Sequence, residues 1–300
     1  MIEANNISKS FQDIKAVDAV SVTIKEGSVF GMIGTNGAGK STFLRMLAGV
    51  LKPDEGTITL DEMPVYENPQ AKRKFFYISD EQYFFPNTTP EELLRYYSVV
   101  YPEFDDLRMK RLLSQFELPE KRKVSTFSKG MKKQLSVICG VCAGTKYLFC
   151  DETFDGLDPV MRQAIKSIFA QEMEERGMTP VIASHNLREL EDICDHVGLL
   201  HRGGVLLSKD LEDMKLNIHK IQCAFHADSN IEQVLQGIEV LQKDIRGSLY
   251  TITARGSEED LKNQIQTAAP IFMEVLPLSL EEIFISETVV TGYDIKKFIL

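Results

Sequence analysis

Residues 29–42 of this chain read Val-Phe-Gly-Met-Ile-Gly-Thr-Asn-Gly-Ala-Gly-Lys-Ser-Thr. The first five residues of this stretch form an apolar run typical of a buried strand, and its last residues begin a helical pattern that Gly49 ends. The loop between them matches the P-loop pattern, in which glycines let backbone N–H groups turn toward phosphate oxygens at a helix N-terminus. The stretch therefore predicts a nucleotide-phosphate site.

Individual residues of this loop have separate expected roles. Lys40 is expected to reach the β and γ phosphates of ATP, and the Ser41 hydroxyl is expected to bind Mg²⁺. A glycine-rich turn with a solvated lysine is the alternative, but the strand before the loop and the helix after it favour the P-loop. The remaining residues of the predicted phosphate cradle are Gly34, Asn36, Gly37, Ala38, Gly39 and Thr42.

Four carboxylates, Asp151, Glu152, Asp155 and Asp158, follow the apolar run at 147–150. Repulsion among them costs stability unless a cation is near. A magnesium ion bound with the nucleotide supplies that cation: Asp151 is expected to hold it through water, and Glu152 to polarise the attacking water. A pair of solvated loop acids is the alternative for these two residues. Asp155 is expected only to be an acid near a helix N-terminus.

Apolar strands alternate with helical segments along the first two thirds of the chain. Strands expected at 29–33, 147–150 and 181–183 alternate with helices at 41–48 and 159–176. This order predicts an α/β fold, a P-loop NTPase core with a mainly parallel sheet. The alternation of Val20, Val22 and Ile24 adds an N-terminal antiparallel β part.

Two further regions depart from this alternation. Residues from about 80 to 144 have a helical pattern that includes a capping box at 89–92, and they are expected to form a helical subdomain. Beyond residue 216, short strands alternate with helices capped by Ser257 and Ser279. We therefore expect an ATPase domain at 1–215 and a small α+β domain at 216–300.

Composition argues against several classes of partner. The chain has 300 residues and a formal net charge of -10, so it repels a nucleic-acid backbone as a whole, and nucleic acid is not an expected partner. No window has the roughly 18 apolar residues of a membrane span, and the N-terminus has no apolar signal segment. A cytoplasmic protein is expected, with its five cysteines as reduced core thiols.

Together with Gly-Leu-Asp-Pro at 156–159, these motifs resemble the nucleotide-binding subunit of ATP-binding cassette (ABC) transporters over about residues 2–215. The family's Leu-Ser-Gly-Gly-Gln signature corresponds to Phe-Ser-Lys-Gly-Met at 127–131, which keeps Ser128 and Gly130. The resemblance implies that these two residues cover the γ-phosphate bound by a second ABC subunit, so that ATP lies between two chains. Lys129 replaces a glycine and is expected to strengthen that phosphate contact, a solvated lysine being the alternative.

The resemblance implies four more site residues. Asp158 is expected to organise the dimer interface, His185 to contact the γ-phosphate, and Phe11 to stack on adenine. At the position where the family has the glutamine of its Q-loop, this chain has Asp80, which is expected at the magnesium ion. Glu81 is the alternative in the other register.

The function that the resemblance implies is ATP hydrolysis driving a separate membrane permease. Residues 83–85 are expected to contribute an aromatic socket for a coupling helix of that permease. The C-terminal extension favours an exporter, held as a peripheral protein at the cytoplasmic face of the cell membrane. The alternatives are a soluble ABC-type ATPase acting on nucleic acid or ribosomes, and a weakly hydrolysing nucleotide-dependent regulator. Whether the dimer contains two copies of this chain or two different cassettes stays open.

Overall fold

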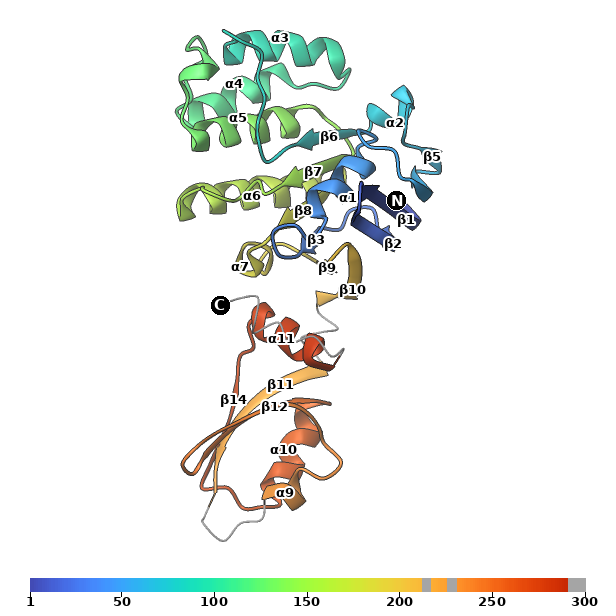
Figure 1. Ribbon diagram of the computed structural model, residues 1–300. Helices are drawn as coiled ribbons and strands as arrows, with labels where there is room; N and C mark the ends of the chain where they lie inside the picture. The colour runs from blue at the N-terminus through green and yellow to red at the C-terminus, as the bar shows by residue number, and fades with distance from the viewer. Residues whose placement is uncertain (212–216, 226–230, 291–300) are drawn as a thin grey trace. The chain divides into compact units, whose positions relative to one another are not determined.

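The computed structural model describes residues 1–211, 217–225 and 231–290 (Figure 1). The chain divides into two compact units, Met1–Ser208 and Lys209–Leu300. The domain boundary expected after residue 215 lies in the segment 212–216, outside the described residues.

The centre of the first unit is a six-stranded sheet with the order β10-β9-β3-β8-β7-β6. The pairs β9/β3, β3/β8, β8/β7 and β7/β6 are parallel, as the alternating pattern predicts. The β3, β7 and β8 strands are buried along their whole length, so they read as continuous apolar runs. The strands are β3 (Phe30–Ile33), β6 (Phe75–Ile78), β7 (Tyr147–Asp151), β8 (Thr179–Ser184), β9 (His196–His201) and β10 (Gly204–Asp210).

The second sheet of this unit is antiparallel, with the order β2-β1-β4-β5. Val20, Val22 and Ile24 of β2 are all buried, and they join the same apolar core as Phe30 of β3 and Phe43 of the first helix. The predicted α/β fold class with its N-terminal antiparallel part is therefore confirmed. The strands are β1 (Ile2–Phe11), β2 (Ile14–Ile24), β4 (Glu55–Leu60) and β5 (Met63–Pro64).

Helices cover the parallel sheet. The first, α1 (Lys40–Leu47), packs against β7 and β8 and buries Phe43 and Leu44. The longest, α6 (Pro159–Arg176), begins with proline, which suits the first helical turn, and ends at Gly177, whose φ of 66° is the left-handed conformation that glycine adopts without strain. Two short helices, α2 (Pro69–Lys72) and α7 (Leu187–Leu190), complete the described set in this unit outside the helical subdomain.

The helical subdomain lies at one end of the first unit in Figure 1. It contains α3 (Pro90–Val100), α4 (Asp106–Gln115), the 3-10 helix η1 (Val124–Thr126) and α5 (Lys129–Cys142). The predicted capping box is present: the Glu92 amide donates to Thr89 Oγ1, and the Thr89 amide donates to the Glu92 carboxylate. Fully buried Glu172 of α6 pairs with Arg108 of α4 and Arg176, which ties the subdomain to the sheet-covering helix.

The second unit is an antiparallel sheet with the order β12-β13-β11-β14 and helices packed on it. Ile221, Cys223, Ile252 and Leu261 belong to its separate apolar core, so this unit has a core of its own. The elements are β11 (Ile218–Ala224), α9 (Ile231–Val234), β12 (Glu239–Arg246), β13 (Leu249–Arg255), α10 (Glu258–Gln266), β14 (Phe272–Leu276) and α11 (Leu280–Val290).

All five cysteines of the chain are buried and unpaired. Burial raises the pKa of the Cys150 and Cys142 thiols to about 12, so they behave as small apolar core residues and not as reactive thiolates. Among the described residues, none of the helices is long and apolar enough to cross a bilayer.

Candidate nucleotide site

The residues predicted to act on the nucleotide meet at one edge of the parallel sheet. The β3, β8 and β7 strands are neighbours, with Ile33 paired to Ser184 and Ala183 to Asp151. The segments that follow their carboxyl ends are therefore adjacent: the P-loop follows β3, His185 follows β8, and Glu152 follows β7. Ligands of open parallel sheets bind at this edge.

The P-loop closes around its own lysine. The Lys40 ammonium is buried and donates to the carbonyl oxygens of Gly34, at 2.7 Å, and Thr35, at 3.3 Å. Gly39 has a φ of 105°, and a Cβ there would lie 2.1 Å from the Ala16 carbonyl oxygen, so only glycine fits this position. In the rest of the cradle, Gly34 and Ala38 are buried, Thr42 is half-buried, and Asn36 and Gly37 are exposed at the loop tip.

Two oxygen ligands suited to magnesium lie together beside the P-loop. Ser41 Oγ, in the first turn of α1, donates to Asp151 Oδ1 at 3.0 Å, and the Tyr77 hydroxyl of β6 donates to Asp151 Oδ2 at 3.3 Å. Burial raises the pKa of Asp151, with the neighbouring Glu152 charge as a further cause, while the hydrogen bond from Ser41 opposes the shift. A buried carboxylate and a hydroxyl are hard oxygen donors that fit Mg²⁺.

Glu152 lies between two groups that face the phosphate site. Its Oε1 atom is 3.3 Å from Lys40 Nζ, and its Oε2 atom is 2.8 Å from His185 Nδ1. The residue adopts φ 47°, a left-handed conformation that costs a non-glycine residue about 1–2 kcal/mol. The predicted catalytic residues Glu152, His185 and Lys40 are thus brought together in one contact network.

The sequence did not single out Lys133, a further charged residue of this network. It lies on α5, is fully buried, and donates to the Glu152 carbonyl oxygen at 2.6 Å. A sequence signal exists: Lys133 shares one helix face with Val137 and Gly140, at the three- to four-residue spacing of a buried stripe. Tyr77, the second donor to Asp151, was also missed, because it is one aromatic residue within an apolar strand.

The signature segment begins α5. Ser128 is the N-cap of the helix, and its Oγ accepts a hydrogen bond from the Met131 amide at 3.2 Å. Lys129 is exposed and Gly130 is half-buried. A Cβ at Gly130 would meet only Ser128 Oγ, at 3.9 Å, so the fold of this unit does not itself require a glycine there. The helix N-terminus presents these residues to the surface, where an anion can approach them.

Comparison with known proteins agrees with this geometry. The sequence model of the family described as ABC transporter matches residues 17–155. The ABC transporter ATP-binding protein YtrB of Bacillus subtilis is 33% identical over 287 residues, which are 96% of this chain and 98% of YtrB. The chain belongs to the family of ABC transporter ATP-binding proteins. Linearmycin resistance ATP-binding protein LnrL, also from Bacillus subtilis, is 32% identical over 212 residues, covering 69% of this chain and 68% of LnrL.

Solved structures give the same assignment. An ATP-binding subunit of an ABC transporter superimposes with a TM-score of 0.67 and 27% identity, over 72% of this chain and 92% of the other. The dimeric bacterial cassette MJ0796 gives a TM-score of 0.64 at 22% identity, over 70% of this chain and 99% of MJ0796, a likeness of fold. The resemblance inferred from the sequence motifs is confirmed.

Asp80 is the residue of this ABC protein that departs most from the family's motifs. It lies in the loop after β6, the neighbour of β7 in the sheet, and its side chain is 47% exposed. Its Oδ1 atom is 3.7 Å from Lys133 Nζ, and its charge is one cause of the raised pKa of Asp151. Asp80 therefore belongs to the same electrostatic cluster as the predicted metal ligand. The side chain of Gln82, in the same loop, donates to the backbone oxygens of Ser79 and Asp80.

Two other predicted site residues lie at the surface of the cassette. Asp158 is the N-cap of α6 and accepts hydrogen bonds from the Val160 and Met161 amides, each at 3.0 Å. Phe11, at the end of β1, is 45% exposed, with Lys9 Nζ 5.9 Å from its ring centre, so it presents an aromatic face that a base can stack on.

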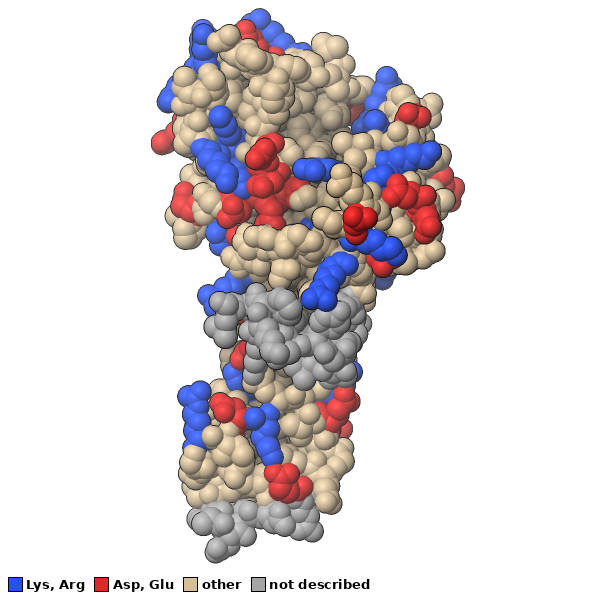
Figure 2. All heavy atoms as spheres, in the orientation of Figure 1, with Lys and Arg blue, Asp and Glu red and all other residues tan. Residues whose placement is uncertain are grey.

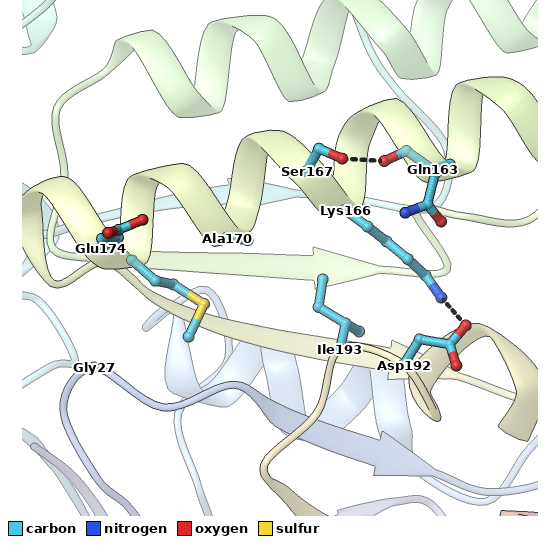
Figure 3. A pocket seen from close by; sticks show the side chains of 9 residues that line it. Gly27, Gln163, Lys166, Ser167, Ala170, Glu174, Asp192 and Ile193 are labelled. Atoms are coloured by element: carbon cyan, nitrogen blue, oxygen red, sulfur yellow. Dashed lines mark hydrogen bonds and ion pairs between the residues drawn. The ribbon is translucent and has the colours of Figure 1, made fainter.

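Acidic side chains gather in one area of the face of the first unit shown in Figure 2, with basic side chains beside them. A separate cavity of about 540 Å³ lies along α6 (Figure 3). There Lys166 Nζ pairs with Asp192 Oδ2 at 3.3 Å, and both charges are thereby matched within the protein. The described residues that line this cavity include none of the predicted nucleotide ligands, so the candidate site is the sheet edge.

The raised pKa of Asp151 predicts a pH-dependent effect of Asp151→Asn on stability. Folded wild-type protein keeps the Asp151 proton to a higher pH than the unfolded chain does, so this carboxyl lowers stability as pH rises through the interval between its ordinary pKa and its raised one. The asparagine cannot ionise. The melting temperature of Asp151→Asn relative to wild type should therefore increase as pH rises above the ordinary pKa of an aspartate, by calorimetry without nucleotide or magnesium.

The matched control is Asp13→Asn, which removes an exposed carboxylate of the same unit. Its melting temperature relative to wild type should stay constant over the same pH range. If the melting-temperature difference between Asp151→Asn and wild type does not change with pH, burial leaves this carboxyl with an ordinary pKa.

Proposed function

We propose that this chain is the ATP-hydrolysing subunit of a bacterial ABC exporter, which binds Mg-ATP at a dimer interface and drives a separate membrane permease. The observation that carries the proposal is the convergence of Lys40, Ser41, Asp151, Glu152 and His185 within hydrogen-bonding distance at one sheet edge. This set contains a phosphate-binding cation, two oxygen ligands for magnesium, and a carboxylate with a histidine beside it.

The contacts of Lys40 suggest how the site responds to nucleotide. Here its ammonium is matched by the Glu152 carboxylate and by backbone oxygens of the P-loop. A triphosphate offers more negative charge, so Lys40 exchanges Glu152 for phosphate when ATP binds. Glu152 is then free to accept a proton from the attacking water, with His185 holding its second oxygen. Ser41 and Asp151 would hold a magnesium ion, which would supply positive charge to the phosphates.

The signature segment supports a composite site between two subunits. Gly130 has neither a close neighbour nor a left-handed φ, so nothing in the described part of the chain demands a glycine there. A glycine N–H that must approach a phosphate of another subunit's ATP gives a reason for it. A cassette of the same fold, MJ0796, is known as a dimer. The exposed carboxylate of Asp158 and the exposed ammonium of Lys129 are available to the same interface.

An exposed aromatic patch supports a permease partner. Tyr83 is 78% exposed, Phe85 is 50% exposed, and the rings of Phe85 and Tyr96 are 5.4 Å apart. The patch borders a cavity of about 330 Å³ that Phe85 and Leu93 help to line. Exposed clusters of large apolar side chains mark protein interfaces, and Tyr83 and Phe85 lie in the same loop as Asp80, between β6 and α3. We assign it to the coupling helix of the permease.

Export and location are inferred from relatives. LnrL is named for linearmycin resistance, and a further relative at 30% identity over 222 residues, BcrA of Bacillus licheniformis, for bacitracin transport. Both names fit the removal of a toxic compound, which favours export for this chain. The chain is then a peripheral protein at the cytoplasmic face of the membrane, where ATP is available.

The first test separates binding from turnover. Lys40→Ala removes the main phosphate cation and should lower ATP affinity at least about tenfold. Glu152→Gln should keep binding but reduce kcat by about 10²- to 10³-fold, because it removes the proton acceptor. Nucleotide fluorescence titration and phosphate release measure the two effects.

Lys52→Ala, which removes an exposed lysine of the same unit, should alter neither quantity. Near-wild-type turnover of Glu152→Gln would refute the role given to this carboxylate. Phosphate release by wild type no faster than in the protein-free background would favour the weakly hydrolysing regulator.

The second test concerns the composite site. Glu152→Gln with Mg-ATP should form a dimer in light scattering, because unhydrolysed ATP bridges Lys40 of one chain and Gly130 of the other. Adding Gly130→Val should abolish the dimer without changing ATP affinity or melting temperature, since the monomer has space for the side chain. Lys132→Val, on the same helix, is the control. A monomer at high concentration with ATP would indicate a different cassette as the natural partner.

The third test concerns the aromatic patch. Tyr83→Asp with Phe85→Asp should leave ATP hydrolysis by the isolated chain within about twofold of wild type but release the chain from the membrane fraction of its own cells, because the charges oppose burial of an apolar partner. Tyr66→Asp, an exposed aromatic outside the patch, should still sediment with membranes. Membrane association that survives the double change would place the permease contact elsewhere.

A further inference from the structure

We propose that Lys133 is a positioning residue for the catalytic carboxylate, and that Asp80 acts through it as its counter-ion. The inference rests on the proposed ATPase function and adds residues that the motifs do not assign. In this arrangement, helix α5 carries the signature at its start and, one turn further on, the ammonium that fixes the backbone of Glu152.

Burial makes the contacts of Lys133 significant. Its side chain is 1% exposed, and an ammonium removed from water must be matched by hydrogen bonds and by negative charge. Among the described contacts, the hydrogen bond goes to the Glu152 carbonyl oxygen, at 2.6 Å, and the negative charge is the Asp80 carboxylate, at 3.7 Å. Removing the Asp80 charge leaves the ammonium with weaker compensation.

The contacts of Lys133 matter for catalysis because one of them is made to the Glu152 backbone. Its left-handed conformation has to be held by its surroundings, and contacts hold it on both sides of the residue. The amide donates to the Ala183 carbonyl oxygen at 3.0 Å, and the carbonyl accepts from Lys133 at 2.6 Å and from the Asp155 amide at 3.3 Å. Together they direct the carboxylate to Lys40 and His185. Without Lys133, the Glu152 carbonyl keeps only the longer hydrogen bond from the Asp155 amide and loses its charged donor, so the carboxylate is held less firmly in its direction.

Asp80 differs from Lys133 and Glu152, the other two residues of this arrangement, because its side chain is 47% exposed and lies on a loop. Its 3.7 Å separation from Lys133 is an ion pair without a direct hydrogen bond, which the loop can tighten or release. A neutral glutamine at this position could not balance the buried ammonium. The aspartate is therefore explained by Lys133, in contrast to the magnesium ligand that the family position suggests.

A double-mutant cycle tests the inference. Lys133→Met should lower kcat about 10- to 100-fold while changing the ATP KM, and the affinity for a fluorescent ATP analogue, less than about threefold. Lys133→Arg should recover at least about a third of the wild-type kcat. Lys132→Met, next to it in the chain and less buried, should keep wild-type kcat.

Asp80→Asn, at a partly exposed position where the fold is not at risk, should lower kcat about three- to tenfold in the wild-type background and have no further effect beside Lys133→Met. Equal effects in both backgrounds would overturn the pairing. So would a loss on Asp80→Asn that excess magnesium restores, which would make Asp80 a metal ligand. A wild-type chain that binds ATP without hydrolysing it would instead refute the proposed function, and the cycle separates these results.

Discussion

The site depends on a balance of charge at the carboxyl end of β7. Asp151 and Glu152 are consecutive carboxylates, one fully buried and one 12% exposed, and Asp80 lies near them. Lys40, His185 and Lys133 approach this group from three other elements and offset part of the cost of bringing its charges together. The neighbouring order of β3, β8 and β7 brings the first two within reach, so the sheet topology is a requirement of the charge balance.

Most of the fold and the centre of the site could be predicted from the sequence, because the signals there are local. A P-loop has its glycines, lysine and serine in one short segment, and an apolar strand before it fixes its orientation. The Asp151 and Glu152 pair follows another buried strand, and Pro159 and Gly177 mark the ends of α6. Each of these assignments needs only contiguous residues, and the structure brings the segments together at one sheet edge.

The remaining site residues could not be predicted in this way, since their roles arise from contacts across the fold. The helical spacing of Lys133 with Val137 and Gly140 marks it as a candidate for burial, but only the packing of α5 in the folded unit places its ammonium beside Glu152. Asp80 was assigned to magnesium by alignment alone. Its proximity to Lys133 depends on the loop after β6, whose path no periodic pattern specifies.

The same charge balance explains how the protein without bound nucleotide accommodates a group of carboxylates whose mutual repulsion costs stability. Lys40 is matched by Glu152, and the pKa of Asp151 is raised by burial, so these groups compensate one another in the protein without nucleotide. In the mechanism that we propose, phosphate replaces Glu152 as the partner of Lys40, and Glu152 keeps its other neighbour, His185. A structural ion pair thus becomes an available base in this mechanism, with the left-handed backbone at Glu152, bonded to Lys133, keeping that base at the site while its partners change.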